Sequence, residues 1–212
     1  TFAIRKRALA VFRLEQYVEQ GIMTARQRDV LLTAITARRN ILVVGGTGSG
    51  KTTLVNALID TMMSTFPHLR MFIFEDTAEI QCRADNCVQY HTTVDVTMAK
   101  LLKISMRMRP DTILVGEVRG PEALDLLMAW NSGHEGGIAT LHANHARAGL
   151  SKLALYISMN QDYPKPIEPL IAEAVQVVVH ITRCAEGRRV DDILEVQGYE
   201  QGQYITRSLI ER

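Results

Sequence analysis

The residues between Gly45 and Thr52 have the types and the spacing of a phosphate-binding loop. The run Gly-Gly-Thr-Gly-Ser-Gly-Lys-Thr matches the G-x-x-x-x-G-K-[ST] pattern at every fixed position. Its glycines allow a tightly curved backbone whose N–H groups point at phosphate oxygens. Lys51 supplies a positive charge for the β- and γ-phosphates, and the Thr52 hydroxyl is a ligand for Mg²⁺. We therefore predict a nucleoside-triphosphate site.

An apolar strand and a helix are expected on either side of this loop. Residues 41–44 are Ile-Leu-Val-Val, which is typical of a strand buried on both faces. Apolar side chains at Leu54, Leu58 and Met62 predict a helix over 53–63 whose dipole faces the phosphates. We expect the nucleotide contacts to come from the loop and the start of this helix: Gly45, Gly46, Thr47, Gly48, Ser49, Gly50, Lys51, Thr52 and Thr53.

Carboxylates follow two further apolar strands. Residues 71–74 predict a second buried strand that leads into the acidic run 75–79, and residues 112–116 predict a third that ends at Glu117. Because ligands of open α/β sheets bind at the carboxyl ends of strands, both acidic groups should face the nucleotide. We expect Thr52 and Glu117 to contact Mg²⁺, and Glu117 also to polarise the attacking water. A solvated acidic loop is the alternative interpretation of 75–79.

A histidine and two arginines complete the set of candidate residues. Residues 136–142 predict a fourth strand that ends in His142, where a ring nitrogen can sense the γ-phosphate. Arg119 directly follows Glu117, and Arg107 lies near the end of a helix expected over 97–109. Either arginine can supply charge to a phosphate of its own or a neighbouring subunit. A simple interaction with the helix dipole is an equal alternative for Arg107.

The pattern of elements predicts an α/β fold with a mostly parallel central sheet flanked by helices and a small C-terminal β extension. Residues 81–96 have no clear period and look irregular or β-rich. The other helices are expected over 13–20, 24–38, 121–133, 145–159 and 167–175. Short strands over 177–182, 191–197 and 203–207, with a turn at 198–202, either extend the sheet or pack as a separate tail.

Composition narrows the function classes. The chain has 212 residues and a net charge of +1, which argues against a dedicated nucleic-acid surface. No apolar run is long enough to span a bilayer. Cys82, Cys87 and Cys184 suit neither a zinc site nor a disulfide framework, so we expect reduced thiols and a cytoplasmic location. The basic run Arg5–Arg7 is interpreted as a solvated linker, with phosphate contact as the alternative.

Four motifs in this order resemble the hexameric secretion-ATPase family that powers type II secretion, type IV pili and type IV secretion. They are the phosphate loop at 45–52, an acidic box at 74–80, a Walker B region at 113–119 and a histidine box at 136–145. The segment 107–119 is most similar to the type IV secretion and conjugation branch. The resemblance implies a RecA-like P-loop NTPase core that hydrolyses ATP with Mg²⁺.

The resemblance also implies roles for individual residues and for partners. Glu79 and Glu117 would order the attacking water, His142 would link phosphate state to subunit movement, and Arg107 or Arg119 would supply charge. The implied partners are further copies in a hexameric ring and other secretion components. The ring would be located in the cytoplasm, or would be bound peripherally at the cytoplasmic face of the inner membrane. The implied domains are a linker from a preceding N-terminal domain over 1–20 and the ATPase domain over 21–212.

Three alternatives stay open from the sequence. A DNA-translocating or pilus-retraction motor would use the same core, although the near-neutral charge offers no direct evidence for nucleic-acid binding. A nucleotide-binding assembly scaffold would carry the same motifs without turnover. A GTP switch is disfavoured because the chain has no Asn-Lys-x-Asp motif for reading the base.

Overall fold

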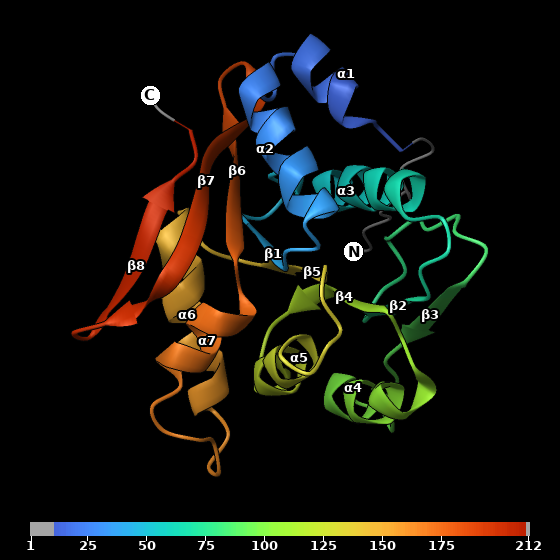
Figure 1. Ribbon diagram of the computed structural model, residues 1–212, viewed down its shortest axis with the longest axis vertical. Coiled ribbons are helices and arrows are strands. Elements are labelled where there is room, and N and C mark those ends of the chain that lie inside the picture. Colours follow the sequence, from blue (N-terminus) through green and yellow to red (C-terminus); the bar gives the residue numbers. More distant parts are fainter. Residues whose placement is uncertain (1–10, 211–212) are drawn as a thin grey trace, which may run out of the picture.

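Apolar segments that are buried on both faces form the centre of an eight-stranded sheet in the computed structural model, which describes residues 11–210 (Figure 1). The order across the sheet is β3-β2-β4-β5-β1-β6-β7-β8. The strands are β1 Ile41–Val44, β2 Met71–Glu75, β3 Cys87–His91, β4 Thr112–Val118, β5 Ile138–Leu141, β6 Val177–Cys184, β7 Gly187–Glu200 and β8 Gln203–Ser208. The pairs from β3 through β6 are parallel, so these strands place their carboxyl ends along one edge.

Helices cover both faces of the sheet, as expected for parallel strands (Figure 1). One apolar core lies between the sheet and α1 Leu14–Glu19, α2 Ala25–Thr36 and α3 Lys51–Thr65. The other lies under α4 Met98–Ser105, α5 Glu122–Trp130, α6 Ala146–Ser158 and α7 Glu168–Ala174, with the short 3₁₀ helix η1 Met106–Met108 after α4. The predicted RecA-like α/β fold is confirmed. Within residues 11–210, no helix has the length and apolarity required to cross a bilayer.

The three C-terminal strands settle an open alternative, because they extend the central sheet. Strand β6 pairs with β1 in parallel, and β7 and β8 follow as antiparallel neighbours. Strand β7 is longer than the predicted strand over 191–197. The turn expected at 198–202 is wrong for residues 198–200, which belong to β7. The ladder continues through Gly198 because a register irregularity between Val196 and Gly198 absorbs the break, so the turn contains only Gln201 and Gly202.

Two other segments acquire a definite structure. The irregular stretch 81–96 contains the edge strand β3, which pairs with β2 from Met71 to Glu75. Residues 11–20, expected as part of a linker, contain α1, whose Leu14 and Tyr17 are buried in the core beside α2 and α3. The basic run 5–7 lies outside the described residues.

Candidate active site

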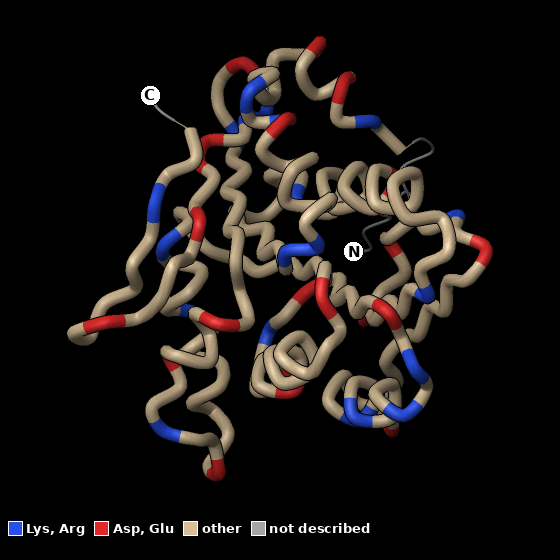
Figure 2. Tube along the Cα trace, viewed as in Figure 1, with Lys and Arg blue, Asp and Glu red and all other residues tan. Residues whose placement is uncertain are grey.

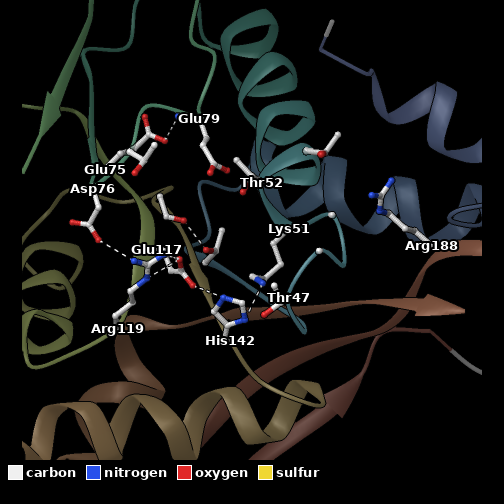
Figure 3. Close-up of a pocket in the computed structure, with 16 residues that line it drawn as sticks. Thr47, Lys51, Thr52, Glu75, Asp76, Glu79, Glu117, Arg119, His142 and Arg188 are labelled. Carbon is white, nitrogen blue, oxygen red and sulfur yellow. Dashed lines mark hydrogen bonds and ion pairs between the residues drawn. The ribbon is translucent and has the colours of Figure 1, made fainter. Parts of the chain in front are cut away.

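The carboxyl ends of four strands meet at one polar cavity of about 330 Å³. Strand β1 leads into the phosphate loop, β2 into the acidic run, β4 carries Glu117 near its end, and His142 follows β5. Figure 3 shows these side chains pointing into the same space from different elements. The predicted convergence of Lys51, Glu79, Glu117 and His142 is therefore present in the fold.

The phosphate loop is held in shape by close packing and left-handed backbone angles. Gly50 is the N-cap of α3 with φ of 101°, a conformation that glycine adopts without a steric penalty. A side chain at Gly45 would have its Cβ 2.2 Å from the carbonyl oxygen of Ile181 on β6. Lys51 is 7% exposed, and its Nζ donates to the carbonyl oxygens of Gly45 at 3.0 Å and Gly46 at 2.9 Å. The ammonium group thus lies inside the curve of the loop.

A continuous polar chain joins this lysine to the end of β4. Lys51 Nζ lies 3.3 Å from His142 Nδ1, and His142 Nε2 lies 2.6 Å from Glu117 Oε1. An ammonium group has only donors, so Nδ1 is the acceptor toward Lys51, and we assign the imidazole proton to Nε2, which lies beside the carboxylate. Burial, followed by the nearby Lys51 charge, lowers the pKa of His142 below its usual 6.5. A neutral imidazole therefore connects the phosphate loop with Glu117.

Arg119 holds the other side of the same carboxylate. Its Nε donates to Glu117 Oε2 at 2.8 Å, and its Nη2 contacts the same oxygen. The Nη1 group lies 3.5 Å from Asp76 Oδ2. These carboxylates, Glu117 first, raise the pKa of Arg119. Arg119 therefore bridges the ends of β4 and β2, which fixes the orientation of the Glu117 side chain.

Glu75, which the sequence analysis did not single out within the acidic run, has the most deeply buried carboxylate of the cavity. It is 3% exposed, and its Oε1 accepts the backbone N–H groups of Glu79 at 3.0 Å and Ile80 at 2.8 Å. Burial raises the pKa of Glu75 despite these two hydrogen bonds. Its Oε2 is buried with no hydrogen-bond partner within residues 11–210. Glu75 thus positions the backbone that carries Glu79. The sequence feature that could have identified Glu75 is its position as the last residue of a buried strand.

The remaining predicted site residues divide into two groups. Thr47, Gly48, Gly50, Thr52 and Thr53 line the cavity, and Gly45, Gly46 and Ser49 complete the same loop.

Arg107 does not line the cavity. It is exposed on η1, before the amino end of β4, whereas the cavity lies at the carboxyl end. At about 3.3 Å per residue, the seven residues of β4 separate the end of the strand that follows η1 from the end at the cavity by roughly 20 Å.

Arg188 lines the cavity and was not predicted. It is the second residue of β7, close to the hairpin turn that joins β6 to β7. Figure 3 shows it on the opposite side of the phosphate loop from Glu117 and Glu79. No sequence motif marks it, because its position depends on β6 pairing beside β1.

The donor set fits a triphosphate with Mg²⁺. The cavity combines the loop N–H groups and Lys51 with the Thr52 hydroxyl and the carboxylates of Glu75 and Glu117, which are the hard oxygen ligands that Mg²⁺ prefers. No group of three or more His, Cys, Asp or Glu in the described part of the chain is arranged to hold a metal.

Comparison with known proteins agrees with this geometry. Residues 1–208 match the family described as Type II/IV secretion system protein. The chain is 47% identical over 204 residues to a probable conjugal transfer protein TrbB of Sinorhizobium fredii, covering 96% of this chain and 62% of the relative. It is 40% identical over 180 residues to the type IV secretion system protein PtlH of Bordetella pertussis, covering 78% of this chain and 52% of the relative. The chain thus spans less than two thirds of these relatives.

Solved structures show the same fold. The VirB11 ATPase of the Brucella suis type IV secretion system superposes with a TM-score of 0.71 at 30% identity, covering 89% of this chain and 66% of that one. The pilus retraction motor PilT, solved with bound ADP, superposes with a TM-score of 0.67 at 23% identity, covering 87% of this chain and 52% of that one. The resemblance to the secretion-ATPase family is confirmed. By its motifs, its fold and these matches, the chain belongs to the type II/IV secretion system protein family.

Proposed function

We propose that this chain is the ATP-hydrolysing domain of a ring-forming motor that energises type IV secretion or conjugative transfer. The observation that carries the proposal is the polar chain from Lys51 through His142 to Glu117, which connects the phosphate loop to the carboxylate of β4. The names of the relatives, a conjugal transfer protein and a type IV secretion protein, support the biological setting.

The predicted site residues of the cavity have separate tasks in this proposal. The loop N–H groups and Lys51 bind the phosphates, and Thr52 with Glu117 would hold Mg²⁺. When bound, Mg²⁺ neutralises charge that develops on the phosphates. Glu79 and Glu117 orient the attacking water, because phosphoryl transfer depends mainly on positioning and charge stabilisation. His142 contacts both Lys51 and Glu117. A change at the phosphates would therefore be passed to His142, which lies in the segment between β5 and α6.

The position of Arg107 favours assembly into a ring. Arg107 is exposed and does not line the cavity of its own chain, so the phosphate charge that it would supply is to the nucleotide of a neighbouring subunit. Figure 2 shows basic residues gathered along α4 and η1, where Lys100, Lys103 and Arg107 lie. We infer a homo-hexamer, located in the cytoplasm or peripheral to the inner membrane and docked on other secretion components.

The proposal is tested by steady-state ATP hydrolysis measured against protein concentration, with oligomer size read in parallel. We expect specific activity to rise with concentration, and Lys51→Ala and Glu117→Gln each to reduce turnover by roughly 100-fold. Arg107→Ala should lower turnover while ATP affinity stays unchanged, and mixing it with Lys51→Ala subunits should restore part of the activity.

The same assay separates the alternatives. Wild-type protein that binds ATP without hydrolysing it at any concentration would favour a nucleotide-binding scaffold. Turnover that rises several-fold with single-stranded DNA would favour a DNA-translocating motor.

A further inference from the structure

We propose that Arg183 and Arg188, on the β6–β7 hairpin, form a phosphate-binding pair that contacts the nucleotide from the side opposite Glu117. The proposal rests on the function proposed above and deepens it: it adds to the nucleotide site Arg188, which lines the cavity, and Arg183, which lies beside Arg188 just outside that lining. Neither residue belongs to the four motifs of the chain.

The alternation of the two strands brings both arginines to the phosphate loop. Val179 and Ile181 on β6, and Val190 on β7, are buried in the core that α3 covers. Arg183 follows Ile181 by two residues and Arg188 precedes Val190 by two, so both point to that same face. The strands therefore present apolar residues where they lie over the core and arginines where they reach the loop.

The surroundings of two loop glycines show how close the arginines lie to the phosphate loop. A Cβ placed on Gly50 would lie 2.8 Å from Arg188 Cδ and 3.2 Å from its Nε. A Cβ on Gly48 would lie 4.0 Å from Arg183 Nη1. Any larger residue at Gly50 would displace Arg188. The stem of Arg188 thus packs on the loop, and the residue lines the same cavity as Lys51 and Thr52 (Figure 3).

The pairing of the two arginines points to an anion. Arg183 and Arg188 are direct cross-strand partners in the antiparallel ladder, and like charges in that position are destabilising. No carboxylate within residues 11–210 makes an ion pair with either one. The next residue, Arg189, faces the other way and pairs with Asp191 at 2.9 Å. A phosphate in the cavity would offset the repulsion between Arg183 and Arg188, and guanidinium groups suit phosphate oxygens in geometry and charge.

The experiment compares Arg188→Gln and Arg183→Gln with the matched control Arg189→Gln. Binding of ATP with Mg²⁺, and of sodium tripolyphosphate as the phosphate tail alone, is measured by isothermal titration calorimetry. We expect Arg188→Gln to weaken both ligands by roughly tenfold or more, Arg183→Gln to weaken them less, and Arg189→Gln to match wild type.

Each outcome decides a different point. ATP and tripolyphosphate affinities of Arg188→Gln equal to those of Arg189→Gln would overturn the pair. Loss of self-association by Arg188→Gln with unchanged affinity would overturn it as well, by assigning the arginines to a subunit contact. Arg188-dependent binding of tripolyphosphate in a wild-type protein that does not hydrolyse ATP would support the pair and refute the proposed function. Wild-type protein that binds neither ligand would refute both.

Discussion

Replacing Glu75 with Gln should raise the stability of the protein, because it removes a buried charge that only partly finds partners. Two hydrogen bonds from the Glu79 and Ile80 N–H groups would weaken by about 1 kcal/mol each when the acceptor becomes neutral. Relief from burying the ionised carboxylate is worth several kcal/mol. The raised pKa of Glu75 shows that burial outweighs the two hydrogen bonds. We therefore expect a net gain of about 1–2 kcal/mol, or roughly 2–8 °C in Tm.

The pH dependence distinguishes this cause from a general packing effect. The folded pKa of Glu75 lies above its ordinary value of 4.5, so the folded protein binds the proton more tightly than the unfolded chain does. Its contribution to wild-type stability is fully present below pH 4.5 and is lost as the pH rises through the folded pKa. The Tm advantage of Glu75→Gln should therefore be small at pH 4.5 and largest at pH 8.

Thermal unfolding followed by circular dichroism at both pH values is the assay. Glu200→Gln, which neutralises an exposed carboxylate, is the control and should leave Tm nearly unchanged. A lower Tm for Glu75→Gln than for wild type at pH 8 would refute the reasoning, and so would an equal offset at both pH values. A stabilised variant that has also lost ATPase activity would show that the carboxylate is retained at a cost to stability.

Three further predictions concern single side chains. The ring of His142 should titrate below pH 6.5 in NMR spectra, and a midpoint above 6.5 would contradict the assigned neutral tautomer. Gly137→Ala places a Cβ 1.9 Å from Trp130 Nε1 and should destabilise the fold by about 3 kcal/mol in urea unfolding, whereas Gly198→Ala has open space and should cost far less. A hydrogen bond from Cys87 lowers the pKa of Cys82 to about 7, so its alkylation rate by iodoacetamide should reach half of its maximum near pH 7; a midpoint near 9 would refute that contact.

Local patterns along the chain were sufficient to predict the elements that surround the cavity. Strands β1, β2 and β4 are short apolar runs followed by glycine or carboxylates, and both signals are local. The capping box of Thr24 and Gln27 is present at the start of α2, with the Gln27 N–H donating to the Thr24 hydroxyl at 3.1 Å. Parallel strands with polar ends then require the predicted residues to meet at one edge.

Features that depend on long-range pairing were not predictable in the same way. The edge strand β3 is only partly buried, so it has no strong apolar period. Arg188 reaches the cavity only because β6 pairs beside β1, a register that no local pattern encodes. Arg107 and Arg119 look equivalent in sequence as arginines near a strand, yet they lie at opposite ends of β4.

The central place of β1 has a consequence for how the chain folds. Strand β1 is made before both of its neighbours in the sheet, which begin only at residues 138 and 177. The phosphate loop also packs on the backbone of Ile181, so it lacks its support until β6 has been made. Such long-range contacts slow folding and leave apolar strands exposed in intermediates. The proposed nucleotide can therefore stabilise only a chain that has been made through β6, and a nascent chain that ends before β6 has to hold β1 without that help.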